Sequence, residues 1–162
     1  MISEKIQKAL NDQINAELFS SYLYLSMAAY FHSENWTGFA AWMQKQSAEE
    51  YGHAIKIYHY LTEVGSRVNF SAIEKPKSEW KSPLDVFEEA HKHELTITNK
   101  INELVNLALS EKDHATNNFL IWFVNEQVEE VSIAMQIIHK LKLVGDNKSG
   151  LYLLDRELSS RQ

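Results

Sequence analysis

Six polar residues stand at positions where the helical pattern of the sequence calls for apolar side chains. Apolar residues recur at alternating steps of three and four through most of the chain, which is typical of amphipathic helices. Near the middle of four such stretches, the inward position holds a carboxylate, an imidazole or an amide instead. The residues are Glu17, Glu50, His53, Glu94, Gln127 and Glu130. Carboxylates and imidazoles are common metal ligands, so the pattern points to metal chemistry inside the protein.

The spacing of these residues repeats within the chain. Glu17 and Glu50 are 33 residues apart, and the same interval of 33 residues separates Glu94 from Gln127. The repeat indicates a duplicated helical hairpin, in which the first helix supplies one carboxylate and the second supplies a pair three residues apart. Residues three apart share a helix face, so Glu50 with His53, and Gln127 with Glu130, can each bind one ion.

Charge balance indicates the kind of ion. Carboxylates that are ionised in a core without a counter-charge cost several kcal/mol each. Two divalent cations would neutralise the four glutamates of the set. Hard oxygen ligands with one imidazole and no sulfur suit iron or manganese, and the same ligands accept zinc. The sequence therefore predicts a dinuclear carboxylate site.

Each of these residues also has an ordinary structural interpretation. A glutamate on an inward stripe often lies at its edge, with the carboxylate in water. His53 alone is compatible with a hydrogen-bonded core histidine, and the pairs Glu49, Glu50 and Glu129, Glu130 with solvated helix faces. Under this interpretation the chain is a structural or interaction protein. The coincidence of polar centres on four helices favours the metal site.

Five helices are expected to position the set. Gly65 and Gly145 suit left-handed helix ends, Ser82 with Pro83 suits a helix start, and Asp113 suits an N-cap. The expected helices run from about Ser3 to Phe31, from Asn35 to Val64, from Pro83 to about Ser110, from Asp113 to Val144 and from Leu151 to Leu158.

The connections between these helices constrain the topology. Two are short, so each joins an antiparallel hairpin. The middle connection, Gly65 to Ser82, has 18 residues. At roughly 3.3 Å per residue it reaches about 59 Å, which exceeds the roughly 42 Å length of a helix of about 28 residues. We expect an all-α four-helix bundle with one long crossover and a short fifth C-terminal helix. The alternative is a plain up-down bundle with an unstructured insertion.

Composition excludes several classes of protein. The absence of cysteine excludes disulfides, thiolate metal sites and a cysteine nucleophile. The net charge of -6 argues against a nucleic-acid partner. The longest stretch without charged residues, Leu18 to Ser33, has 16 residues and is too short for a bilayer, and no secretory signal is evident. We expect a single domain over residues 1–162, without a membrane partner, in the cytoplasm.

In combination, the motifs of this chain resemble those of the ferritin family, and specifically of the non-haem bacterial ferritins. The segments that carry the resemblance are Asn15-Ala-Glu17 with Tyr22 and Tyr24, Ala48-Glu-Glu-Tyr-Gly-His53, His93-Glu94, Lys112-Asp-His-Ala-Thr116, Asn118-Phe-Leu, Trp122, Glu126-Gln-Val-Glu-Glu130 and Gly150-Leu-Tyr-Leu. The resemblance covers essentially the whole chain. It implies a ferritin-like bundle that acts as a ferroxidase, oxidising Fe(II) with dioxygen or peroxide and storing Fe(III) mineral in a hollow cage of 24 subunits.

The resemblance also implies roles for individual residues. The implied ligands of the first iron are Glu17, Glu50 and His53, with Glu50 bridging, and those of the second are Glu94 and Glu130, with Gln127 close by. A third iron is implied at Glu49, Glu126 and Glu129, with Glu130 shared. Tyr24 and Trp122 match the aromatic neighbours of such sites, although core packing explains them equally well.

Two positions depart from related families. Gln127-x-x-Glu130 replaces the second Glu-x-x-His motif that di-iron bundles carry, so the implied second iron has weaker, oxygen-rich coordination and moves on to the store. Gly52 stands where bacterioferritins carry a haem-ligating methionine, so no haem is expected. The alternative function is a di-iron oxidase or peroxide-scavenging bundle that stores no iron.

Apolar surface is expected to support the cage. Several aromatic residues exceed the needs of one small core and are candidates for subunit contacts: Phe19, Tyr30, Phe31, Trp36, Phe39 and Trp80. The tail from Leu151 to Leu154 resembles the helix that lines the four-fold axis of ferritin cages, or else packs on its own bundle.

Overall fold

The five expected helices form, with boundaries close to the expected ones. The computed structural model describes residues 2–161. Its helices are α1 (Glu4–Ser33), α2 (Thr37–Glu63), α3 (Pro83–Ser110), α4 (His114–Val144) and α5 (Lys148–Ser159). Helix α5 begins three residues earlier than expected, because Asn147 caps it and accepts a hydrogen bond from the backbone N–H of Gly150.

Local capping explains the other helix ends. The side chain of Ser82 accepts from the backbone N–H of Asp85 at the start of α3, and that of Asp113 accepts from Thr116 at the start of α4. Gly65 and Gly145 follow α2 and α4 with φ of +72° and +59°, the left-handed region in which a side chain is strained. The predicted start and stop signals are confirmed.

Helix α2 begins with a cap that comes from another helix. Trp36 offers no side-chain hydrogen bond there, and the carboxylate of Asp155 in α5 accepts from the backbone N–H of Phe39 at 2.9 Å. A Cβ atom at Gly38 would lie 1.8 Å from the carbonyl oxygen of Asp155, so only glycine permits this close approach. The fifth helix is thus fixed against the bundle.

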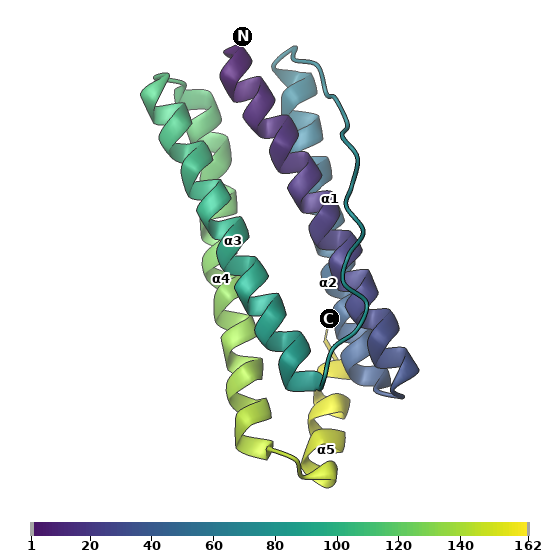
Figure 1. Ribbon diagram of the computed structural model, residues 1–162. Coiled ribbons are helices and arrows are strands. Elements are labelled where there is room, and N and C mark those ends of the chain that lie inside the picture. The colour runs from purple at the N-terminus through teal and green to yellow at the C-terminus, as the bar shows by residue number, and fades with distance from the viewer. Residues whose placement is uncertain (1, 162) are drawn as a thin grey trace.

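The long connection is an ordered crossover along α1. Figure 1 shows it running beside α1 from the end where α2 stops to the opposite end, where α3 starts. Three side chains of α1 donate hydrogen bonds to it: Asn11 to the carbonyl of Arg67 at 3.1 Å, Asn15 to that of Ala72 at 3.1 Å and Ser26 to that of Lys77 at 2.6 Å. The crossover topology is confirmed, and the plain up-down bundle is wrong.

The apolar core consists of two clusters with polar residues between them. One cluster, around Phe31, Phe39 and Phe87, fills the end where α5 docks. The other, around Leu10 and Ile57, fills the opposite end. Each inward stripe is therefore apolar at its ends and polar at its centre, and the polar layer fixes the level of the site.

The expected role of the excess aromatic residues is wrong for most of them. Phe31 and Phe39 are fully buried, and Tyr30 and Trp80 are more than nine-tenths buried, all within the chain's own cluster. Because α5 and the crossover pack against this end of the bundle, the core there is larger, and this explains the large number of aromatic residues. Other large apolar side chains are exposed instead, among them Tyr22, Leu25, Tyr51, Tyr152 and Leu153.

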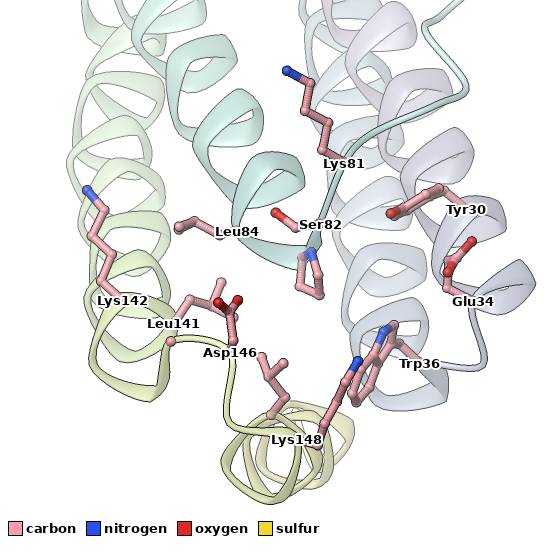
Figure 2. Close-up of a pocket in the computed structure, with 13 residues that line it drawn as sticks. Tyr30, Glu34, Trp36, Lys81, Ser82, Leu84, Leu141, Lys142, Asp146 and Lys148 are labelled. Carbon is pink, nitrogen blue, oxygen red and sulfur yellow. The ribbon is translucent and has the colours of Figure 1, made fainter.

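A cavity of about 570 Å³ lies where α5 meets the ends of the other helices (Figure 2). Its lining mixes charges, with Lys81, Lys142 and Lys148 beside Glu34 and Asp146. None of the six polar stripe residues lines it. Over residues 2–161, no helix is both long enough and apolar enough to cross a bilayer.

Candidate metal centre

The six polar stripe residues come together at one level of the bundle. Helix α1 supplies Glu17, α2 supplies Glu50 and His53, α3 supplies Glu94, and α4 supplies Gln127 and Glu130. All six are at most 5% exposed. The interpretation that places these glutamates at the edge of the stripe, in water, is therefore wrong for this set.

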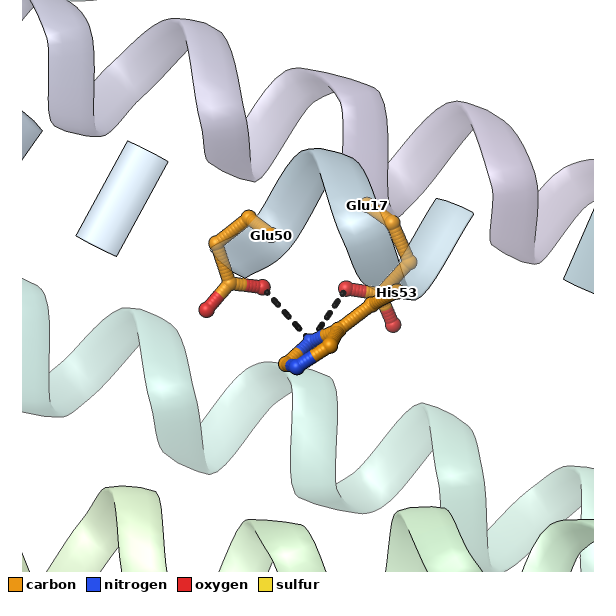
Figure 3. Close-up of side chains that lie close together, drawn as sticks. All are labelled: Glu17, Glu50 and His53. Carbon is orange, nitrogen blue, oxygen red and sulfur yellow. Dashed lines mark ion pairs between the residues drawn. The ribbon is translucent and has the colours of Figure 1, made fainter. Parts of the chain in front are cut away.

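One group of possible ligands belongs to the first hairpin. Ligand atoms of Glu17, Glu50 and His53 lie within 4.8 Å of one another. Figure 3 shows both carboxylates directed at the imidazole, whose Nδ1 is 3.3 Å from Oε2 of Glu50 and 3.7 Å from Oε2 of Glu17. Two carboxylates and one imidazole form a donor set that suits a divalent cation.

A second group joins the two hairpins. Ligand atoms of Glu50, Glu94 and Glu130 also lie within 4.8 Å of one another. The phenol of Tyr24 donates to Oε1 of Glu94 at 2.5 Å, and the amide of Gln127 donates to its Oε2 at 3.1 Å. Glu50 belongs to both groups, which is the position that a bridging ligand requires.

Burial opposes ionisation of the carboxylates. Loss of solvent raises the pKa of Glu50 well above its ordinary value and also raises the pKa of Glu94. The same effect, with the charge of Glu94 adding to it, raises the pKa of Glu130 to about 7. Burial would lower the pKa of His53, but contacts with Glu17 and Glu50 outweigh it and raise that pKa to about 11. Without metal, bound protons therefore balance the negative charge of these groups, and a bound metal ion would displace those protons.

Unpartnered oxygens supply a direct test of whether a cation fits. Oε2 of Glu17 and Oε2 of Glu50 are buried and accept no hydrogen bond. Buried polar atoms normally have a partner, and an unpaired one costs about 1–3 kcal/mol. Both oxygens lie in the group that contains His53. The donor chemistry and the missing partners both fit a bound cation.

A third group extends from the centre toward the surface. Ligand atoms of His53, Glu126 and Glu130 are within 4.8 Å of one another, with Nε2 of His53 3.8 Å from Glu126. A depression of about 560 Å³ opens over this group, lined by Glu49 among others. The carboxylate of Glu49 is bound to Arg161 at 2.7 Å instead.

The other residues implied for a third iron are less tightly grouped. Glu129 is exposed and belongs to none of the three groups, so the structure brings Glu126 and Glu130 together but not the whole expected set. Arg161 also stacks over the ring of Trp42 at 4.3 Å, which holds the C-terminal end against α2.

The two aromatic neighbours contact the centre differently. Tyr24 is buried and hydrogen-bonded to Glu94, and burial together with the charge of Glu94 raises its pKa well above 10. Trp122 is 38% exposed and meets His53 edge to face, with ring centroids 5.3 Å apart. Tyr24 therefore orients a candidate ligand, whereas Trp122 covers the outer side of the imidazole.

Two glutamines contact the carboxylates and were given no role from the sequence. Gln13 donates to Oε1 of Glu17 at 2.8 Å, and Gln46 donates to Glu50 at 2.9 Å. Each precedes its glutamate by four residues and so lies on the same helix face. That offset is a usable sequence signal for hydrogen-bond donors to buried carboxylates.

Comparisons with known proteins give one consistent result. A family model described as a ferritin-like domain matches residues 7–144. The bacterial non-heme ferritin of Bacteroides fragilis is 45% identical over 161 residues, covering 99% of this chain and 100% of that protein. The bacterial non-heme ferritin of Campylobacter jejuni is 41% identical, over 99% of this chain and 97% of that protein.

A solved structure matches equally fully. The crystal structure described as a novel open pore ferritin from the hyperthermophilic archaeon Archaeoglobus fulgidus superposes with a TM-score of 0.99. Its sequence is 53% identical, and the match covers 100% of this chain and 99% of that one.

Proposed function

The chain belongs to the ferritin family, and on that premise we propose that it is an iron-storage ferroxidase that takes up Fe(II), oxidises it and retains the Fe(III). The buried carboxylates and the imidazole carry this proposal, because they offer grouped ligand atoms and two of the carboxylate oxygens accept no hydrogen bond in the protein. Iron is both the substrate and the stored product.

Each residue of the centre has a proposed part. Glu17, His53 and Glu50 hold one Fe(II), Glu94 and Glu130 hold the other with Gln127 beside them, and Glu50 lies between the two. Each of the two Fe(II) ions gives one electron, and the two electrons with two protons reduce dioxygen to hydrogen peroxide, or hydrogen peroxide to two water molecules. Hydrolysis of the resulting Fe(III) releases protons. The protein fixes two ions close together and balances their charge with four carboxylates.

The surface group extends the same proposal to the path of iron. Glu126 and Glu130, which the structure brings together, bind a third iron on its way out of the centre, and Glu49 and Glu129 would join them only by moving from their present positions. The second motif, Gln127-x-x-Glu130, supports this because it offers no imidazole to retain the oxidised ion.

Storage requires an assembly, and we propose a homo-oligomeric cage of 24 subunits. Large apolar side chains on the outer faces support it, since Tyr22 and Leu25 of α1 are more than half exposed. Helix α5 buries one face on α2 and exposes Tyr152 and Leu153, which leaves them for contacts between subunits. The open pore is described for the A. fulgidus ferritin, and electron microscopy of this protein distinguishes open from closed packing.

Aerobic iron loading tests the proposal. A double substitution, Glu50→Ala with His53→Ala, should abolish fast oxygen consumption on addition of Fe(II) while the assembly keeps its mass in light scattering. Glu63→Ala with His139→Ala removes the same residue types from exposed positions and is the matched control. Equal stopped-flow rates in both variants would show that the centre does not carry the oxidation.

The iron content after loading separates the possible functions. A large excess of iron over protein chains, with a mineral core, is expected for storage. About two irons per chain would indicate a di-iron oxidase or peroxide-scavenging bundle instead. Absence of bound iron would leave only the structural interpretation.

A further inference from the structure

The amide of Gln46 contacts carboxylates from both hairpins. Its Nε2 donates to Oε1 of Glu50 at 2.9 Å and to Oε2 of Glu130 at 2.7 Å. Glu50 follows on the same helix, whereas Glu130 lies on α4. His53 also contacts two of the four carboxylates, but both, Glu17 and Glu50, belong to the first hairpin. Among the described residues, no other side chain donates hydrogen bonds to one of the four carboxylates in each hairpin.

The surroundings of Gln46 leave it little freedom. The residue is 1% exposed, and both hydrogens of its amide are used. Its Oε1 is buried without a partner, so the side chain is held by its nitrogen alone. A buried amide with one satisfied end and one unsatisfied end is costly, which indicates that the two donated bonds have a role beyond stability.

We propose that Gln46 is a positioning residue that couples the two halves of the metal centre. By occupying one oxygen of Glu50 and one of Glu130, the amide turns the second oxygen of each toward the ion. Because one nitrogen makes both bonds, a movement of Glu50 on binding one ion is transmitted to Glu130 in the other half. The inference depends on the proposed function only in requiring that both halves bind an ion.

The chemistry of the side chain suits this task. An amide donates two hydrogen bonds without adding charge, so the balance between four carboxylates and two divalent ions is unchanged. A lysine would add a positive charge that competes with the metal. Gln13 provides an internal comparison, because it donates to one carboxylate only, Glu17.

Calorimetric titration of the metal-free assembly with Zn²⁺ tests the coupling without relying on iron oxidation. Gln46→Met keeps the length of the side chain but cannot donate, and it should weaken both binding steps by about tenfold. Gln13→Met, the matched control, should weaken only one step. Co²⁺ gives a second readout, because its absorption spectrum reports ligand geometry and should change in both halves only for Gln46→Met.

A second variant guards against a loss of folding. Gln46→Asn keeps the amide but is one methylene shorter, so it cannot reach both carboxylates and should weaken both steps as Gln46→Met does. Wild-type isotherms for Gln46→Met or Gln46→Asn, or a change confined to one step, would overturn the coupling while the metal centre stands. A wild-type protein that binds fewer than two Zn²⁺ per chain would overturn both the centre and the inference.

Discussion

The two halves of the centre occupy equivalent positions in a repeated hairpin but differ in how their oxygens are satisfied. In the first half, Oε2 of Glu17 and Oε2 of Glu50 accept no hydrogen bond and lie 3.7 and 3.3 Å from Nδ1 of His53. In the second half, both oxygens of Glu94 accept hydrogen bonds, from Tyr24 and Gln127. A cation would supply a ligand contact to oxygens without a hydrogen bond in the first half, and would compete with existing hydrogen bonds in the second.

This difference predicts that the two halves bind metal with different affinities. A cation would give the two Oε2 atoms of the first half, which accept no hydrogen bond, a direct partner, so the first half should bind first and more tightly. The second half lacks an imidazole and is already satisfied, so its ion should be held less firmly. The repeat places candidate ligands at matching levels of the two hairpins, and the residues that differ between the hairpins should set the order in which the two ions bind.

The largest effect is expected at the residue that the two halves share. Glu50→Ala removes a carboxylate that belongs to both groups, so neither ion keeps its ligand set. Because loss of a residue that merely supports a ligand costs about 10–100-fold, loss of this one should slow iron oxidation at least about 100-fold. Stopped-flow oxygen uptake measures the rate. If Glu50→Ala still bound one ion as tightly as the wild type does, that half of the centre would not depend on Glu50.

A double substitution would remove the difference between the halves. Gln127→Glu with Glu130→His gives the second half the Glu-x-x-His pattern of the first. The second ion should then bind about as tightly as the first, and after oxidation about two irons per chain should resist chelation. Iron analysis after gel filtration with a chelator measures retention. Release as fast as in the wild type would mean that the second motif does not set the iron's mobility.

The effect of pH on the stability of the metal-free protein is expected to be intermediate in size. Glu130 has a pKa of about 7 in the folded chain against an ordinary 4.5, and His53 has a pKa of about 11 against 6.5. Because both are raised, their protons stabilise the folded state below the ordinary pKa, and that contribution is lost as pH rises through the folded value. The Tm of the metal-free protein should therefore fall as pH rises from 4.5 to about 11.

Metal should reverse this trend, because Zn²⁺ replaces the protons. The gap in Tm between Zn²⁺-loaded and metal-free protein should widen as pH rises. Glu130→Gln removes one titrating group and should flatten the lower part of the metal-free profile. A gap that is constant with pH would contradict proton displacement. Scanning calorimetry in matched buffers provides the data.

The smallest effect is expected from the phenol in the second half. Tyr24→Phe leaves Oε1 of Glu94 without a donor, while Gln127 still orients the carboxylate. The metal-free protein should lose about 1–3 kcal/mol of stability, as for a buried charged hydrogen bond. The second half then resembles the first, so the two Zn²⁺ affinities should move closer together. If the two Zn²⁺ affinities moved further apart in the titration, the proposed difference between the two halves would be wrong.

The sequence predicted the helices and the six inward residues because both follow from local pattern. Start and stop signals such as Ser82 and Gly145 act within a few residues, and Glu94 is recognisable as a polar interruption of an apolar stripe. The 33-residue repeat further placed each pair at matching levels of its hairpin. These features depend on residues that are close in sequence, so the periodicity of the sequence is enough to predict them.

Other features depend on contacts between distant segments. Glu49 was expected beside the third iron, but Arg161, 112 residues away, binds it. The link that Gln46 makes does not follow from spacing, because its second partner, Glu130, lies on another helix. Phe31 and Phe39 were expected at subunit contacts because the docking of α5 was not foreseen in detail. Spacing alone does not give the register between hairpins that creates such contacts.

Metal occupancy in crystals soaked without oxygen tests the central claim most directly. Crystals of the assembly exposed to increasing Fe(II), with anomalous scattering measured at the iron edge, give the occupancy of each position. The account predicts that iron appears first between Glu17, Glu50 and His53, and only at higher Fe(II) beside Glu94 and Glu130. Iron that fills the second position first, or both equally at every concentration, would contradict it.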